Sequence, residues 1–172
     1  MSHRPWRSFL MGYSEGSISA GTGLNLNLLN FGYIFEKGLG VNATWVGGAH
    51  ILKNNTNMAG NNIIFINRTE ISYGMLMVGP MYSISISDES KLDFKARAGT
   101  FYVREDISGY NSHSISQTIS LGYSLAASYR YQFASRWCTI LSGDYFSSLA
   151  NNNFFFNKVR PLSLTAGVGF VF

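Results

Sequence analysis

The sequence of 172 residues predicts an all-β fold, an eight-stranded antiparallel up-and-down barrel. Two observations lead to this prediction. Apolar and polar side chains alternate with a period of two along most of the chain, and tight turns alternate with longer polar stretches. A period of two is that of a β-strand, whereas capped segments with helical spacing are not evident. From the length we expect residues 1–172 to form a single domain.

The segment 115–133 shows the alternation most clearly. Leu121, Tyr123 and Leu125 lie on one face, while Gly122 and Ser124 lie on the other. Similar alternation elsewhere predicts strands over residues 6–14, 18–35, 39–50, 68–87, 91–104, 115–133, 136–148 and 158–172. The apolar phase slips by one residue at Leu28–Leu29, which predicts a β-bulge there.

The connections between these strands come in two kinds. Tight turns are expected at Glu36–Gly38, Asp88–Ser90 and Ala134–Arg136, and a short first loop at Ser14–Ser17. Longer polar stretches cover residues 51–67, 105–113 and 149–157. In an up-and-down meander all tight turns then lie at one end of the barrel and all long loops at the other. Both chain termini fall at the tight-turn end.

The composition indicates which face of the barrel points outward. A soluble, lipocalin-like barrel would hold its apolar face inside, and a membrane barrel would turn that face to lipid. Bulky apolar residues occur on nearly every predicted strand, and an eight-stranded lumen is too narrow for all of them. The polar face is rich in Gly, Ser, Thr and Asn, whereas a water-facing surface should carry many charges. The sequence therefore favours a transmembrane β-barrel, apolar outside with a small, polar lumen, and leaves the soluble barrel as the alternative.

The few charged residues inside the predicted strands carry both signs. Such groups could pair across a narrow lumen as a buried polar plug, because buried polar groups need partners. A catalytic cluster or a proton path is the alternative interpretation. The expected lumen network consists of Asp93, Lys95, Arg97, Arg130, Asp144 and Glu70.

Three hairpins and the final strand resemble small bacterial outer-membrane β-barrels of the OmpA/OmpX type. The hairpins are NFGYIFEKGLGVNATW, GPMYSISISDESKLDFKARAGTFYV and LGYSLAASYRYQFASRWCTILSGDY, and the final strand ends SLTAGVGFVF. The resemblance implies an outer-membrane location with periplasmic termini and exposed long loops. It also implies that Phe170 and Phe172 form the signal read by the outer-membrane assembly machinery, and that lipids and lipopolysaccharide surround the barrel.

Several classes of function find little support in the sequence. Cys138 is the single cysteine and the three histidines are scattered, so we expect no metal site and no cofactor. The basic residues stand singly, which argues against nucleic-acid binding. Some barrels of this kind are lipid A deacylases with a Ser two residues after a His, but His113 is followed by Ser114 and Ile115.

We therefore expect a non-enzymatic integral outer-membrane protein. Its barrel would anchor surface loops for adhesion, envelope integrity or contact with a larger membrane complex. A lipid A-modifying enzyme and a narrow solute or ion channel are the alternatives. Neutral polar and aromatic loop residues suit contact with a protein partner. The candidates for such contact are Tyr110, Phe154, Phe155 and Phe156, although the three phenylalanines could instead belong to an interfacial aromatic girdle.

Overall fold

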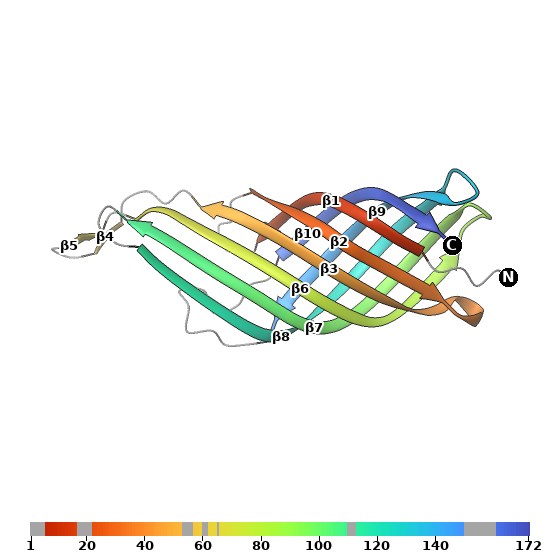
Figure 1. The fold of residues 1–172 in the computed structure, drawn as a ribbon, viewed down its shortest axis with the longest axis horizontal. Coiled ribbons are helices and arrows are strands. Elements are labelled where there is room, and N and C mark those ends of the chain that lie inside the picture. Colours follow the sequence, from red (N-terminus) through yellow and green to blue (C-terminus); the bar gives the residue numbers. More distant parts are fainter. Residues whose placement is uncertain are drawn as a thin grey trace.

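The computed structural model describes residues 6–16, 22–52, 57–59, 62–64, 66–109, 113–149 and 161–172. In these ranges the chain consists of β-strands with one short 3-10 turn, η1 (Glu36–Gly38) (Figure 1). The strands are β1 (Trp6–Gly16), β2 (Thr22–Ile34), β3 (Leu39–Leu52), β4 (Asn57–Ala59), β5 (Asn62–Ile64), β6 (Ile66–Ser85), β7 (Ser90–Gly109), β8 (His113–Gln132), β9 (Trp137–Ser148) and β10 (Pro161–Val171). No helix within the described ranges is long and apolar enough to cross a membrane.

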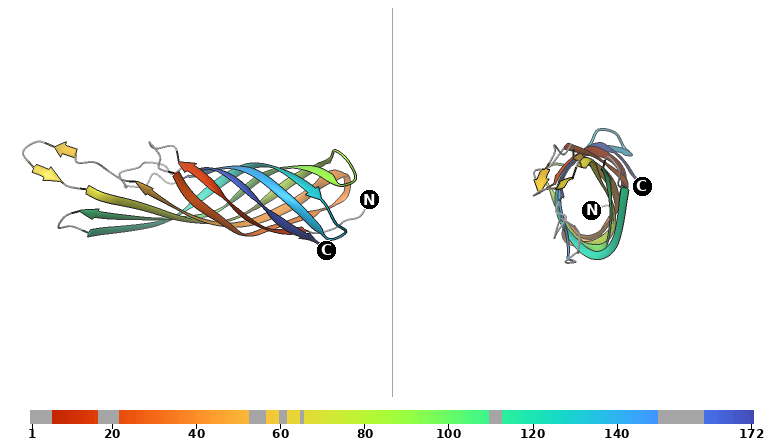
Figure 2. Two further views of the ribbon diagram at one scale, coloured as in Figure 1. Left: turned by 90° about the horizontal axis from the view of Figure 1, so that it is seen from above. Right: turned by 90° about the vertical axis from the view of Figure 1, so that its left-hand side faces the viewer.

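The strands close on themselves into an antiparallel barrel, in the order β1-β10-β9-β8-β7-β6-β3-β2. Pairing of β1 with β10 completes the ring, and it runs from Trp6 opposite Val171 to Gly16 opposite Pro161. The end-on view in Figure 2 shows the ring directly. The small hairpin β4–β5 forms a separate sheet in a segment that the sequence pattern predicts as loop. The prediction of an all-β antiparallel barrel is confirmed.

The register of the strands confirms one local prediction and extends another. Pairing of β2 with β3 shifts between Asn27 and Leu29, where the sequence predicts a bulge. Strand β7 continues to Gly109, beyond the predicted end at residue 104. The extra residues are held on both sides, since Glu105 lies opposite Ile71 of β6 and Ser116 of β8. As a result β6, β7 and β8 reach past the other barrel strands at the loop end (Figures 1 and 2).

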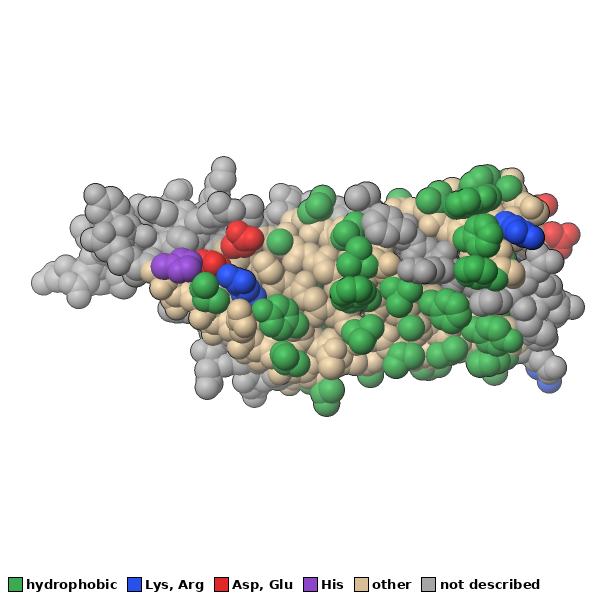
Figure 3. Space-filling view, in the orientation of Figure 1, with side chains coloured by type: hydrophobic (Ala, Val, Ile, Leu, Met, Phe, Trp, Pro, Cys, Tyr) green, Lys and Arg blue, Asp and Glu red, His purple; other side chains and the backbone are tan. Residues whose placement is uncertain are grey.

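Side chains alternate between the two faces of the barrel wall. On β8, Leu121 and Leu125 are exposed, whereas Gly122, Ser124 and Ser128 are buried inside. Figure 3 shows apolar side chains spread over the barrel body, with acidic and basic side chains towards both ends and histidine towards the loop end. The wall therefore carries an apolar outer face, as the sequence predicts.

The lumen differs from the prediction, because it is not uniformly small and polar. Large apolar side chains from β6, β7 and β9 are fully buried in it, namely Met75, Met77, Met81, Phe101 and Phe146. The residues between Tyr73 and Met81 are apolar on both faces of β6, so their pattern does not show which face turns inward. Gly122 on β8 has no side chain and so leaves room for the Phe101 ring of β7. A Cβ atom at Gly122 would lie 3.1 Å from Cδ2 of Phe101.

Two glycines of the wall differ sharply in the space around them, which predicts different tolerance of a methyl group. A Cβ atom at Gly99 would lie 2.0 Å from the carbonyl oxygen of Leu76, whereas one at Gly143 would meet nothing within 4 Å. We expect Gly99→Ala to lower the free energy of unfolding by about 1–3 kcal/mol, because the neighbouring strand must shift. Gly143→Ala should leave it unchanged. Urea titration of the refolded protein, followed by tryptophan fluorescence, measures both; equal stability of the two variants would contradict the packing described.

Candidate functional site

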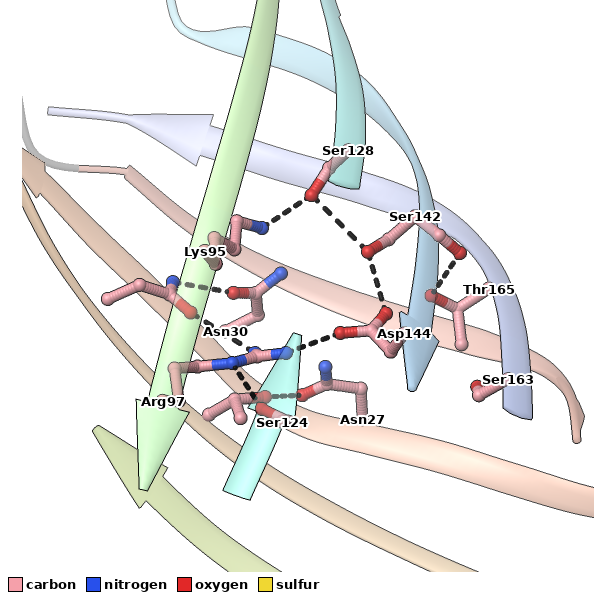
Figure 4. Close-up of polar contacts among 12 residues, drawn as sticks. Asn27, Asn30, Lys95, Arg97, Ser124, Ser128, Ser142, Asp144, Ser163 and Thr165 are labelled. Carbon is pink, nitrogen blue, oxygen red and sulfur yellow. Dashed lines mark hydrogen bonds and ion pairs between the residues drawn. The ribbon is translucent and has the colours of Figure 1, made fainter. Parts of the chain in front are cut away.

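Arg97 lies at the centre of a polar layer inside the barrel (Figure 4). Its Nε donates to Oγ of Ser124 at 2.9 Å, its Nη1 to Oδ1 of Asn42 at 3.2 Å, and its Nη2 to Oδ1 of Asp144 at 2.5 Å. The side chains of Arg97 and Asp144 are 1% and 5% exposed. One guanidinium group therefore joins β7 to β8, β3 and β9 through the lumen.

Hydroxyl and amide groups extend this layer around the Arg97–Asp144 pair. Ser142 donates its hydroxyl to Oδ2 of Asp144 at 2.7 Å. The Lys95 ammonium donates to Oγ of Ser128 at 2.6 Å, and the hydroxyls of Ser128 and Ser142 are 3.3 Å apart. Lys95 thus reaches the Asp144 carboxylate through two serines, as Figure 4 shows.

A second ion pair lies nearer to the tight turns. Nη2 of Arg130 is 3.3 Å from Oδ1 of Asp93, and both side chains are buried. The structure therefore brings five of the predicted charges into the lumen, which are Asp93, Lys95, Arg97, Arg130 and Asp144.

The sixth predicted member of the network, Glu70, does not lie there, and this part of the prediction is wrong. Glu70 precedes the buried Ile71 on β6, so it shares the outward face with Ser72. Its partner in the register with β7 is Asp106, which also faces outward. The sequence of β6 does not show which of its side chains point inward. In the structure the odd-numbered side chains do so.

Apolar side chains close the lumen on both sides of the polar layer. Towards the tight turns lie Met81, Cys138, Ile140 and Val171, with Ile34 packed against them. Towards the loops lie Val46, Ile71, Tyr73, Met75, Met77, Phe101, Val103 and Phe146. The Phe146 ring lies 5.9 Å from the Arg97 guanidinium carbon. Sequence reasoning missed both layers.

The degree of burial shows that this stack of layers is tight. Asp93, Asn42 and Ser124 are each 0% exposed, so these polar side chains are fully enclosed by the protein. A cavity of about 250 Å³ opens at the tight-turn mouth. Its lining includes Asp88, Glu89 and Lys91, Arg130 of the second ion pair, and Cys138 and Val171 of the apolar layer. Beyond that cavity, side chains fill the described lumen around Arg97 and Asp144.

The remaining candidates for chemistry are dispersed. His113 lies on the outer face, where its Nε2 is 2.8 Å from Oδ1 of Asp106, and the next residue on that face of β8 is Ile115. His50 stacks on Tyr73 inside the barrel, with ring centroids 5.6 Å apart. Among the described residues no group of His, Cys, Asp and Glu could hold a metal ion.

The structure describes the residues of the predicted assembly signal but not those of the predicted loop contacts. At the end of the chain the Phe170 ring packs edge-on against Phe172 at 5.1 Å and against Trp137 at 5.4 Å. These rings form an aromatic cluster at the tight-turn end. Tyr110, Phe154, Phe155 and Phe156 lie outside the described residues.

Removing one partner of the buried Arg97–Asp144 pair should be costly. We expect Arg97→Met to lower the free energy of unfolding by about 3–5 kcal/mol, because Asp144 would stay buried without its countercharge. Arg104→Met is the matched control, since Arg104 is 42% exposed and its nitrogen is 3.7 Å from the Asp106 carboxylate. That exposed pair should contribute less than about 1 kcal/mol. Urea titration of both variants checks this, and similar losses in the two would refute the role given to Arg97.

Comparison with known proteins shows which class of barrels this fold is similar to. No protein-family model matches the chain, and no curated protein matches it. Neisserial surface protein A (NspA) shares 15% identity over 98% of this chain and 96% of its own, with a TM-score of 0.65. Ail, the attachment invasion locus protein of Yersinia pestis, shares 16% identity over 99% of this chain and 100% of its own, with a TM-score of 0.59. A major outer membrane protein from Thermus thermophilus shares 10% identity over 100% of both chains, with a TM-score of 0.67. The chain therefore has the fold of small bacterial outer-membrane β-barrels.

Proposed function

We propose that this protein is an eight-stranded transmembrane barrel of a bacterial outer membrane, which anchors surface loops and catalyses no reaction. The observation that carries the proposal is the exposed apolar face of a closed barrel. Leu76, Leu121 and Leu164 are 57%, 66% and 58% exposed, on three different strands. In water so wide an apolar surface would drive aggregation. In a bilayer it meets lipid, and a closed barrel is the strand architecture that can pair its backbone there.

Aromatic residues support a boundary of the lipid-facing surface at each end. Exposed aromatic residues at the tight-turn end include Phe35, Tyr131, Phe133, Trp137 and Phe172. Towards the loops Tyr123 and Tyr145 pack with ring centroids 6.5 Å apart. Outer-membrane barrels carry such girdles at both interfaces. Beyond Tyr123 the outward residues of β8 are Leu121, Ile119, Gln117, Ile115 and His113, so polar groups that suit an aqueous surface begin at Gln117.

The lengths of the connections at the two ends give the orientation that we propose. Outer-membrane barrels have short periplasmic turns and longer external loops. The tight turns and both termini would therefore be periplasmic, and the Phe170–Phe172 end would be read by the assembly machinery. Lipids, including lipopolysaccharide, would surround the apolar wall. An outward groove of about 710 Å³, with Ala96, Ala127 and Gly143 in its lining, offers space for acyl chains.

Neither alternative function gains support from the site. A solute or ion channel needs a polar path through the lumen, but apolar layers lie on both sides of the Arg97–Asp144 pair. A deacylase of the kind considered above needs a serine two residues after its histidine, but the face of His113 continues with Ile115. The surface role remains, as adhesion, envelope integrity or contact with a larger complex, with Tyr110 and Phe154–Phe156 proposed as contacts. Ail is an attachment invasion locus protein with the same fold, which favours adhesion among these roles.

Epitope insertion tests the proposed orientation. A tag placed at residues 150–157 should bind antibody on intact Gram-negative cells, because this segment would be external. The same tag in the Asp88–Ser90 turn should bind only after the outer membrane is permeabilised. Mobility of the unheated and boiled protein on a gel confirms that both variants fold. Equal labelling of the two tags on intact cells would reject the proposed topology.

Electrical recording tests the closed lumen. Purified protein in a planar bilayer should give no steady single-channel current, because apolar side chains around Met77 and Met81 lie on both sides of the buried Arg97–Asp144 pair. Flotation of the same protein with lipid vesicles is the control for insertion. A steady conductance that changes with Arg97→Met would show instead that ions pass through the lumen.

A further inference from the structure

Strand β8 is longer than its pairing with β9, and this leaves a sheet edge open. Pairing with β9 covers Gly122 to Gln132, and one further bond joins the Leu149 N–H to the Leu121 carbonyl at 2.8 Å. From His113 to Ser120 the strand pairs with β7 on its other side. Within the described residues no strand lies on the β9 side of this segment, which we call the β8 edge (residues 113–120). The hairpin of β7 and β8 carries this edge beyond the barrel (Figures 1 and 2).

The direction of the Leu121 carbonyl shows which backbone groups face outward along the edge. In an antiparallel strand the N–H and C=O of one residue point to the same side, and successive residues alternate. Since the Leu121 carbonyl points towards β9, the backbone groups of Ile119, Gln117 and Ile115 point the same way. The side chains of Ile115 and Ile119 are 46% and 73% exposed. The β8 edge thus offers both backbone hydrogen bonds and apolar side chains.

The β8 edge lacks the features that usually protect such an edge. Proteins blunt open edges with lysine, proline or β-bulges. From Ser114 to Leu121 the sequence holds no charged residue and no proline, and the pairing of β8 with β7 shows no register shift. An edge of this kind can accept a further strand from another chain.

The sequence of the β8 edge indicates which strand would fit. The segment Ser114–Ser120 reads SISQTIS, which is the same in both directions apart from exchange of Ser116 and Thr118. We propose that the β8 edge pairs with the β8 edge of a second copy of this chain, antiparallel and centred on Gln117. This register places Gln117 opposite its own copy and Ile115 opposite Ile119.

Backbone and side chains agree on this register. The odd-numbered residues whose backbone groups face the open side become the hydrogen-bonded pairs. Gln117 then exchanges two bonds with its copy, and each Ile115–Ile119 pair exchanges two more. On the outer face the β-branched isoleucines meet one another, and on the inner face Ser116 meets Thr118, both of which are favourable cross-strand pairs. The interface is isologous, as a two-fold dimer requires.

The direction of the strands fixes how the two barrels would face each other. Two antiparallel edges are related by a two-fold axis perpendicular to the sheet, so the second barrel points the opposite way. If the barrel spans a membrane as proposed above, the second copy belongs to a facing membrane, and the pairing links two surfaces. This arrangement deepens the proposed surface role and rests on it, whereas the strand pairing does not.

Disulfide trapping in detergent tests the pairing alone. In a Cys138→Ser background, Gln117→Cys should give a covalent dimer on mild oxidation, because the paired Cα atoms would be about 5.5 Å apart, within reach of a disulfide. Ile115→Cys is the matched control, since its own copy would lie four residues away along the partner strand. Heat-modifiable mobility confirms that each variant is folded. A dimer from Gln117→Cys alone supports the pairing, and equal cross-linking at both positions, or none at either, overturns it.

Clustering of lipid vesicles tests the facing arrangement. Vesicles that carry the protein should cluster, and Gln117→Lys should abolish clustering, because each lysine would lie directly opposite its own copy. Gln132→Lys, at the other end of β8, should leave clustering unchanged. Flotation of the vesicles reports insertion separately, so failure of the membrane proposal is distinguishable. Clustering that persists in Gln117→Lys overturns the facing dimer.

Discussion

The pairing of β1 with β10 is the interaction on which the rest of the structure depends. It turns a meander of hairpins into a ring, so that neighbours satisfy the backbone of each strand without recourse to solvent. Once the ring is closed, the strand period of two sorts every side chain to an outer or an inner face. The outer face can then be wholly apolar, and the inner face must fill a space just wide enough for side chains.

That narrow space explains the layered lumen. Buried charges are stable only where their hydrogen-bonding capacity is met, and Arg97 meets this condition through partners on three other strands. The apolar layers around Met77 and Met81 keep water from the Arg97–Asp144 pair and strengthen it in a medium of low dielectric. Charged and apolar layers therefore support one another in the described part of the lumen.

Much of this fold was predictable, because alternation is a local property of the sequence. The strands, the bulge at Leu28–Leu29 and five lumen charges followed from it, with strand ends less certain. The apolar layers were not predictable, since Tyr73–Met81 is apolar on both faces of β6 and only long-range register decides which face turns inward. The position of Glu70 depended on the same choice. Register between distant strands such as β3 and β6 is set by the closed ring, which no single segment encodes.

Closure of the ring does not pair the whole length of every strand, and the β8 edge lies in the part of β8 that β9 does not reach. In a closed ring, a strand is paired on both sides only where both of its neighbours are long enough to reach it. Strands β6, β7 and β8 exceed that length, so among the described residues an edge opens where β9 ends at Ser148. A strand that merely overshoots the barrel would be expected to carry lysine or proline there, because an unprotected edge invites association. The edge around Gln117 carries neither and is nearly self-complementary, which is the pattern expected of a surface that is retained for pairing.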